Sequence, residues 1–303
     1  MNRREFCALA GAAAAAGAAG GEKVAIAVGG KPFTNFYYGK EWDKPFLYPL
    51  LTASGRVISR GWPVEPREGE TNDHAWHRGI WFGHGDVNKH DFWREQGRQK
   101  TSCLFVKGVP AQTGRPDRPS LSAELAMTIP TGKSIGTVRG NFTFWDKGAN
   151  RFIDAHIAVH ADAGEALRFG DTDDGGFGFR LSDEFREDRG AQLRNSEGLQ
   201  GTNNVWGKPA RWVDYSAQLD GKLVGMAVFD HPSNLRHPTT WHARGYSLCS
   251  ANPFGLSSFT RDKSKDGSHT VPAGGKLEFR YRVVIHEGTA RLEALFAEFA
   301  SSR

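Results

Sequence analysis

Apolar and polar residues alternate along most of this 303-residue sequence, and this alternation restricts the fold more than any other feature. In residues 277–286 the odd positions are apolar and the even positions are mostly polar, which is typical of a strand with one buried face. Residues 151–160 alternate in the same way. Further strands are predicted at 24–28, 35–38, 46–51, 101–106, 122–129, 136–145, 176–181, 223–229 and 246–251. The sequence therefore predicts an all-β protein.

The C-terminus departs from this alternation. Leu292, Leu295, Phe296 and Phe299 recur at the spacing i, i+3, i+4 and i+7, so the pattern predicts a helix with one apolar stripe and Thr289 as its N-cap. Because the strands do not alternate with helices, a parallel βαβ arrangement is disfavoured. We predict one large antiparallel β-sandwich over residues 21–303, with a jelly roll as the alternative.

A Pro-Gly turn at residues 271–276 leads into the strand at 277–286. This segment is similar to the closing strand of galactose-mutarotase-like proteins, in which such a turn precedes a long amphipathic strand. The resemblance implies that the sandwich has the supersandwich architecture of those proteins.

The N-terminus has the parts of a signal peptide in their usual order. Arg3 and Arg4 precede Phe6, and an Ala/Gly-rich stretch follows. This apolar stretch is shorter than the about 20 residues that span a bilayer, and its mild hydrophobicity is typical of the twin-arginine route. We therefore predict that residues 1–20 are a twin-arginine-type signal peptide and that the protein is periplasmic or otherwise exported.

Charge and cysteine content exclude some classes of partner. The net charge is +5, and the basic residues are scattered, so nucleic acid is not an expected partner. After the predicted signal peptide the sequence has no apolar run of 18 residues, so we expect no stable membrane insertion. Cys103 and Cys249 leave two alternatives open, a disulfide or two isolated buried thiols.

Residues 73–93 concentrate histidine, aspartate, arginine and tryptophan. Imidazoles and carboxylates together can act as general acids and bases near neutral pH. The tryptophan rings offer flat apolar faces that suit the C–H faces of sugars. This segment is the first candidate site.

Two other segments carry polar side chains at predicted strand ends. Residues 230–242 follow the strand at 223–229 and are stiffened by Pro232 and Pro238, and a rigid turn follows at 251–255. Residues 171–176 form an acidic, glycine-containing stretch that resembles a calcium loop in composition. It lacks the spacing of an EF-hand, so we interpret it as a turn that enters a strand.

Together these segments resemble one family of bacterial proteins. Residues 73–88 follow the pattern D-H-x-x-H-R-G-x-x-F-x-H-G-D-V-N, and 44–50, 175–178, 212–215, 230–241 and 251–255 fit the same family. These are the soluble proteins labelled "PmoA family", and Lys89 departs from their commoner glycine. The resemblance implies saccharide processing. The methane-oxidising membrane enzyme with a subunit of that name has several spanning helices, so the sequence does not support methane oxidation.

The predicted function is that of an exported carbohydrate-active enzyme that uses His/Asp acid–base chemistry for hydrolysis, elimination or epimerisation of a saccharide. The candidate catalytic residues are His77, His84, His231 and His242, with Asp86 to orient an imidazole. The candidate substrate-binding residues are Arg78, Trp81, Asn88, Trp93, Arg236, Trp241 and Asn252. Arg78 and Arg236 are equally compatible with buried ion pairs to Asp73 and Asp230, and some of the tryptophans fit the core as well as a sugar platform.

Two alternatives remain open. In one, the protein binds carbohydrate without catalysis, and the histidines are structural. In the other, it is a metal-dependent oxygenase or hydrolase, with His77, His84 and Asp86 as ligands of a divalent metal. No cofactor is otherwise predicted. The candidate catalytic site requires residues 73–93 and 230–242 to converge on one cleft.

Overall fold

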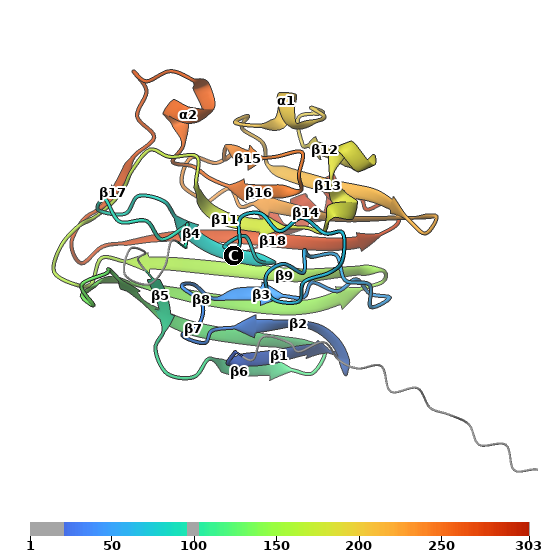
Figure 1. Cartoon of the computed structure of the whole chain (residues 1–303), viewed down its shortest axis with the longest axis horizontal. Coiled ribbons are helices and arrows are strands. Elements are labelled where there is room, and N and C mark those ends of the chain that lie inside the picture. The colour runs from blue at the N-terminus through green and yellow to red at the C-terminus, as the bar shows by residue number, and fades with distance from the viewer. Residues whose placement is uncertain (1–20, 96–102, 303) are drawn as a thin grey trace, which may run out of the picture.

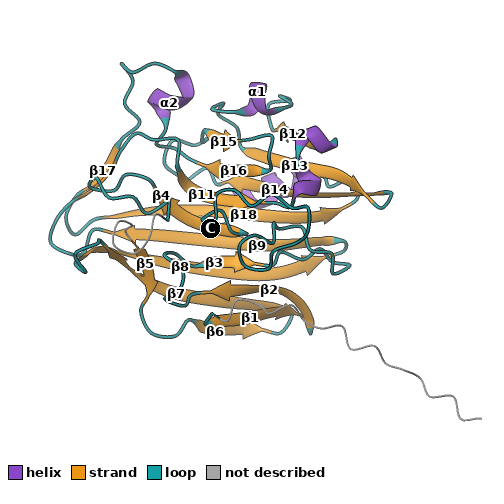
Figure 2. Ribbon diagram, in the orientation of Figure 1, coloured by secondary structure: helices purple, strands orange, loops and turns teal. Residues whose placement is uncertain are grey.

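The computed structural model of the protein describes residues 21–95 and 103–302. The predicted signal peptide, residues 1–20, lies outside the described residues. The described strands form two large antiparallel sheets that face each other (Figures 1 and 2).

The larger sheet contains nine strands within the described residues, and its order is β12-β13-β14-β18-β9-β8-β7-β5, with β6 paired to β7. The bounds of these strands are β5 (Cys103–Val106), β6 (Ala111–Arg115), β7 (Arg118–Thr128), β8 (Ser134–Lys147), β9 (Asn150–His160), β12 (Gln192–Asn195), β13 (Trp212–Leu219), β14 (Lys222–Asp230) and β18 (Lys276–Glu287). Its centre is a set of long strands that pair over their full length, such as β9 with β18.

The smaller sheet contains seven described strands in the order β1-β2-β3-β4-β11-β16-β15. Their bounds are β1 (Lys23–Val28), β2 (Lys31–Tyr37), β3 (Phe46–Tyr48), β4 (Ile80–His84), β11 (Gly175–Arg180), β15 (Trp241–Ala243) and β16 (Leu248–Ala251). A separate pair joins β10 (Leu167–Phe169) to β17 (His269–Val271). The order of the seven-stranded sheet brings segments that are far apart in the sequence next to one another.

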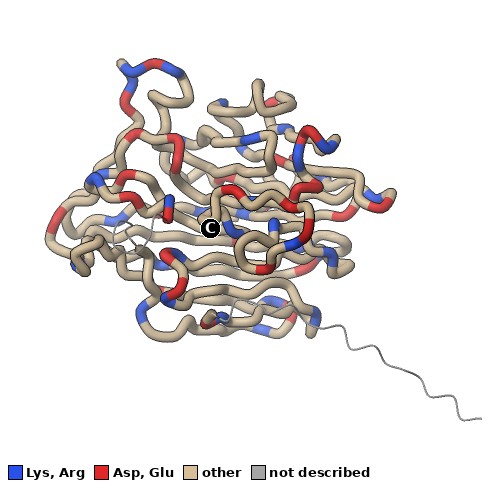
Figure 3. The backbone as a smooth tube through the Cα atoms, viewed as in Figure 1, with Lys and Arg blue, Asp and Glu red and all other residues tan. Residues whose placement is uncertain are grey.

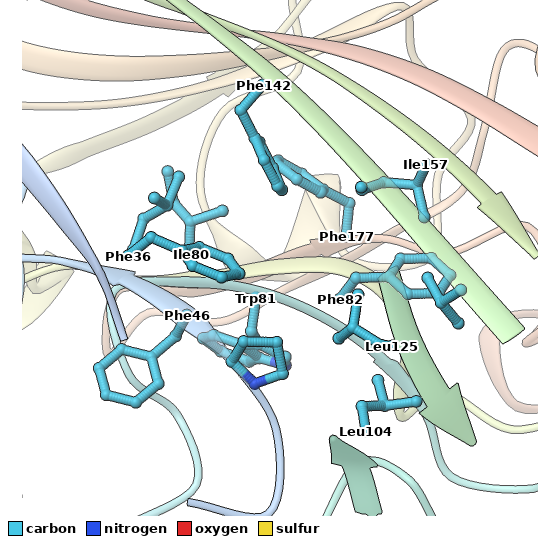
Figure 4. A pocket seen from close by; sticks show the side chains of 14 residues that line it. Phe36, Phe46, Ile80, Trp81, Phe82, Leu104, Leu125, Phe142, Ile157 and Phe177 are labelled. Carbon is cyan, nitrogen blue, oxygen red and sulfur yellow. The ribbon is translucent and has the colours of Figure 1, made fainter. Parts of the chain in front are cut away.

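The hydrophobic core lies between the two sheets. Phe82 and Phe177 of the seven-stranded sheet meet Leu125, Phe142 and Ile157 of the nine-stranded sheet (Figure 4). They surround a small apolar void of about 30 Å³. This apolar void is too small for a substrate, so the candidate site must lie elsewhere.

Helix α3 (Leu292–Ala300) covers the outer face of the nine-stranded sheet. Its predicted stripe of Leu292, Leu295, Phe296 and Phe299 packs against Phe152, Trp212, Ala227, Phe229 and Val284. The predicted N-cap Thr289 is wrong: Arg291 takes that position, because the chain runs on for three residues after Gly288, whose φ is +81°. The other helical segments are short, namely α1 (Thr202–Val205), α2 (Leu256–Thr260), η1 (Asp183–Phe185) and η2 (Glu187–Arg189).

The all-β fold and the C-terminal helix are confirmed. The jelly-roll alternative is wrong, because the described sheets contain more strands than the eight of a jelly roll. Strand β13 was missed, although it alternates like the others, with Val213, Tyr215, Ala217 and Leu219 in the core. Within the described residues no helix has the length and apolar character needed to cross a membrane. Basic and acidic residues are interspersed along the backbone (Figure 3).

Candidate functional site

The seven-stranded sheet has an inner face toward the core and an outer face that carries the candidate site. Residues that pair across an antiparallel ladder share one face, and successive residues alternate between faces. Gly178 pairs with Trp81 on one side and with Ser250 on the other, and Ser250 pairs with His242. These residues lie on the outer face, whereas their neighbours Phe82 and Phe177 point into the core.

A pocket of about 330 Å³ lies over this outer face. Its volume falls in the range of about 300–1,000 Å³ that is common for small-molecule sites. The pocket is lined by His74, Trp76, His77, Arg94, Asp173, Asp174, His242, Arg244, Tyr246 and Leu248. It therefore combines aromatic faces, two carboxylates, two guanidinium groups and three imidazoles.

The loop of residues 73–77 forms one wall of the pocket, and Arg60 sets its shape. The Arg60 side chain is fully buried and donates hydrogen bonds to the backbone carbonyls of Asp73 at 2.8 Å, His74 at 2.9 Å and His77 at 3.1 Å. It also pairs with the Asp73 carboxylate, to which Arg180 donates a second bond at 3.1 Å. The loop is thereby fixed from beneath by two buried cations.

Four aromatic rings stack in series along this wall. The His74 ring lies between Tyr246 and His77, with centroids 6.0 and 5.0 Å away and interplanar angles of 6° and 5°. The His77 ring in turn stacks on Trp81 at 5.2 Å and 11°. Gly178 provides room beneath the stack, because a Cβ atom there would come within 2.8 Å of the Trp81 ring. The stack runs from the half-exposed His74 down to the buried Trp81.

His77 is only 2 % exposed, and neither of its ring nitrogens has a hydrogen-bond partner among the described residues. Burial lowers the pKa of His77 well below its ordinary value, and the nearby Arg180 guanidinium lowers it further. The imidazole is therefore neutral at neutral pH. Because His77 lines the pocket, both of its nitrogens are available to a ligand that enters it.

The acidic side of the pocket comes from the turn before β11. Asp174 pairs with the Arg94 guanidinium, which also contacts Asp91 at 3.1 Å. Burial raises the pKa of Asp174 above its ordinary value, although Arg94 opposes this shift. The site thus contains a carboxyl group whose affinity for a proton is increased.

His242 is held on both of its ring nitrogens. Its Nδ1 lies 2.6 Å from the Asp173 carbonyl, and the Arg244 Nε donates to its Nε2 at 2.9 Å. These partners require the neutral tautomer with the proton on Nδ1, and burial correspondingly lowers the pKa of His242. Arg244 also lies 3.8 Å from the Asp173 carboxylate, so it links the imidazole to the acidic turn.

The predicted metal ligands His77, His84 and Asp86 do not form a group, so that set is wrong. In the part of the chain that the structure describes, the ligand atoms that lie within 4.8 Å of one another belong to Asp173, Asp174 and His242. Arg94 and Arg244 already contact these atoms and neutralise the carboxylates. A divalent metal stays a prediction, with Asp173, Asp174 and His242 as the only described ligand set of this kind.

The two predicted segments do meet. His74, Trp76 and His77 from residues 73–93 line the same pocket as His242 from residues 230–242. Trp81 and Trp93 lie beneath His77, 2 % and 1 % exposed, and support its ring without lining the pocket. Arg78 is also buried below, where it pairs with Glu95 rather than with Asp73.

His84 does not reach the pocket. It shares the inner face of β4 with Phe82, and its ring packs between Phe169 and Phe254 at 5.3 and 4.8 Å. Its Nε2 lies 2.9 Å from the Gly170 carbonyl, which fixes the proton on that nitrogen. Side chains alternate between the two faces of a strand, so His84 points into the core when Trp81 points to the outer face. The prediction that His84 belongs to the site is therefore wrong.

The buried position of His84 predicts a loss of stability in acid. Burial lowers the pKa of His84 to about 4, whereas the ordinary value is 6.5. Between these values the unfolded chain binds the additional proton, so stability falls as the pH falls through this window, by up to about 3 kcal/mol. We expect H84Q, whose amide can still donate to Gly170, to flatten the change in unfolding free energy between pH 7 and pH 4.5.

Urea unfolding at both pH values measures this difference. H156Q is the matched control, because the His156 side chain is 43 % exposed beside Glu278. An equal pH dependence in H84Q and the wild type would contradict the assignment.

Three further candidates from residues 230–242 lie away from the pocket. His231 contacts Ser233 at 2.7 Å and packs on Phe299 of α3. Arg236 donates to the carbonyls of Pro253, Gly267 and Ser268, so it fixes loops and does not pair with Asp230. Trp241 is fully buried and donates to the Ala210 carbonyl at 2.9 Å. Neighbouring residues of a strand point to opposite faces, so Trp241 points into the core while His242 points to the pocket.

Asp86, Asn88 and Asn252 stabilise turns around the site. The Asp86 carboxylate accepts a bond from the Lys89 amide at 2.8 Å and does not orient an imidazole of the pocket. Asn88 has a φ of +52° and bridges to the Ala166 carbonyl and the Arg168 amide. The fully buried Asn252 donates to the carbonyls of Thr172 and Asp173 at 2.9 and 3.0 Å. It therefore positions the acidic turn without touching the pocket.

Several residues of the pocket were not selected from the sequence. They are His74, Trp76, Arg94, Asp173, Asp174, Arg244, Tyr246 and Leu248. The acidic turn was the available signal for Asp173 and Asp174, but its composition equally fits an ordinary turn. Cys103 and Cys249 are both buried and are not joined in a disulfide, which agrees with the alternative of two separate thiols.

The chain belongs to a family of unknown function, DUF6807, whose model matches residues 23–300. No curated protein matches the sequence. The family match does not carry the PmoA label, so that resemblance stays a prediction.

Comparison with solved structures gave matches of low sequence identity. The Slr1438 protein of Synechocystis sp. PCC 6803 is 12 % identical over 96 % of this chain and 100 % of its own, with a TM-score of 0.39. A galactose mutarotase related enzyme from Lactobacillus acidophilus is 10 % identical over 88 % of this chain and 98 % of its own, with a TM-score of 0.45. An alpha-galactosidase from Lactobacillus brevis is 8 % identical over 90 % of this chain and 40 % of its own, with a TM-score of 0.42.

Proposed function

We propose that the protein is an enzyme that binds a saccharide in the pocket of about 330 Å³ and exchanges protons with it. One observation carries the proposal: His77 lines this pocket, is neutral and buried, and has no described partner for either nitrogen. Such an imidazole is available both to accept a proton and to donate one.

The lining of the pocket favours a sugar over a purely apolar ligand. Trp76 and Tyr246 supply ring faces for the C–H groups of a sugar. Arg94, Arg244 and the two aspartates supply donors and acceptors for hydroxyl groups. A sugar ring presents both kinds of surface at once, which matches this arrangement.

Asp174 is the proposed partner of His77. Its raised pKa favours the protonated form more than that of an ordinary aspartate, whereas His77 favours the neutral form. A proton acceptor and a proton donor in one pocket are the elements of general acid–base catalysis, which contributes about 10²–10⁴-fold to a rate. Hydrolysis, elimination and epimerisation all use this pair.

The twin-arginine pattern of residues 1–20 leads us to propose that the reaction takes place outside the cytoplasm. Free nicotinamide nucleotides are scarce there, and proton transfer needs no such cofactor.

A product screen tests the proposal. Purified protein is incubated with neutral oligosaccharides, uronic-acid oligosaccharides and keto-sugars, and products are detected by mass spectrometry and NMR. We expect a product from at least one class. Binding of a saccharide without any product would support the non-catalytic carbohydrate-binding alternative, and neither binding nor product across the panel would refute the proposal.

A further inference from the structure

A second pocket adjoins the proposed site on the side of Arg244. It has a volume of about 130 Å³ and is lined by Thr202, Asn203, Trp206, Arg244 and Arg261. Arg244 lines both pockets, and Thr202 and Asn203 also line a wider hollow of about 520 Å³ beyond. The three hollows share lining side chains and therefore lie in series, with Thr202 and Asn203 of α1 between the second and the third.

Trp206 is the aromatic centre of the second pocket. It directly follows α1, packs edge-on against Phe259 of α2 at 5.3 Å, and approaches His242 of the main site at 6.5 Å. Its indole Nε1 is buried without a hydrogen-bond partner among the described residues.

Two guanidinium groups flank this ring. The Cζ atoms of Arg244 and Arg261 lie 5.4 and 6.0 Å from the Trp206 ring centroid. The lining of the second pocket contains no carboxylate, and Arg261 forms no ion pair with a described residue. In the main site, by contrast, the charges of Arg94 and Arg244 are balanced by Asp173 and Asp174. Arg261 therefore gives the second pocket an excess of positive charge, whereas Glu187 and Asp188 line the wider hollow beyond it.

We propose that the Trp206 pocket is a second subsite, which binds the neighbouring acidic unit of an oligosaccharide whose reacting unit occupies the main pocket. The inference rests on the proposed function and adds the substrate class: a chain of at least two sugars that carries carboxylate or sulfate groups. The indole stacks on the ring of the second unit, and Arg261 pairs with its anionic substituent. Guanidinium groups suit such anions because they form charge-assisted, forked hydrogen bonds.

Calorimetric binding of galacturonic acid and of tri-galacturonic acid, with cellotriose as the neutral chain, tests this subsite. We expect the wild type to bind the acidic trisaccharide about tenfold more tightly than the monosaccharide, because the second subsite adds a stacked ring and a charge-assisted contact. W206A and R261A should each remove this gain and leave monosaccharide binding unchanged. R139A is the control, since the Arg139 side chain is 52 % exposed on β8 in an ion pair with Glu124.

The other outcomes distinguish a failure of the second subsite from a failure of the proposed function. If the monosaccharide binds and chain length has no effect in the wild type, the subsite is refuted while the proposed function stands. If cellotriose gains as much as the acidic chain and R261A has no effect, the acidic specificity is refuted. If none of the three saccharides binds and the product screen is also negative, both proposals are refuted.

Discussion

Replacement of His77 by phenylalanine is expected to abolish turnover while the fold is retained. The phenyl ring fills the slot between His74 and Trp81, whose centroids lie 5.0 and 5.2 Å from that of His77. It carries no nitrogen, so the proton acceptor is lost and kcat should fall by about 10²–10⁴-fold. The substitution also removes two buried polar atoms without partners, so the thermal unfolding temperature should stay the same or rise.

Turnover and unfolding temperature, measured together, distinguish a catalytic role of His77 from a structural one. Turnover of the saccharide found in the product screen is measured beside the unfolding temperature of the same preparation. H156F is the matched control, because His156 is exposed on β9. Full turnover in H77F would show that the imidazole is only a packing element of the stack. A lower unfolding temperature would show that its nitrogens have partners that satisfy them.

Replacement of Arg60 by alanine is expected to destabilise the protein severely. The guanidinium is 0 % exposed and holds three backbone carbonyls of residues 73–77 as well as the Asp73 carboxylate. Its loss leaves buried acceptors unsatisfied and opens a cavity, which together should lower the free energy of unfolding by about 3–5 kcal/mol. Because this loop carries His74 and His77, saccharide binding should weaken in the fraction that still folds.

R56A is the control for this prediction. Arg56 also forms two ion pairs, with Glu184 and Asp220, but its side chain is 28 % exposed and its partners are 42 % and 85 % exposed. Exposed ion pairs contribute about 0–1 kcal/mol, so R56A should unfold at nearly the wild-type urea concentration. Equal losses in R60A and R56A would contradict the role of Arg60 as the support of the loop.

The sequence predicted the fold well because the fold depends on a local pattern. The alternation in residues 277–286 reflects β18, whose inner face enters the core, and the spacing of Phe296 and Phe299 reflects the single face that α3 buries. Short strands such as β10 and β15 were missed, because three residues contain too little alternation to be recognised.

The candidate site was predicted only in part, because the alternation does not say which face is the inner one. His77 and His242 were selected and do share the pocket. His84 and Trp241 were selected on the same grounds, but they lie on the core face of their strands. Asp174 and Arg244 join the pocket through the order β4-β11-β16-β15, in which β4 and β11 are about 100 residues apart in the sequence and β11 and β16 about 70, so there is no local signal.

The two faces of the seven-stranded sheet restrict how relatives of this chain can diverge. Along β15 the pocket residue His242 is flanked by the core residues Trp241 and Ala243, and outer-face and core residues alternate in the same way along β11. A point substitution on the pocket side changes what the site recognises and leaves the core sequence intact. Insertion or deletion of a single residue within these strands would exchange the two faces at once. Specificity can therefore evolve here by substitution, while changes of length are confined to the connecting loops.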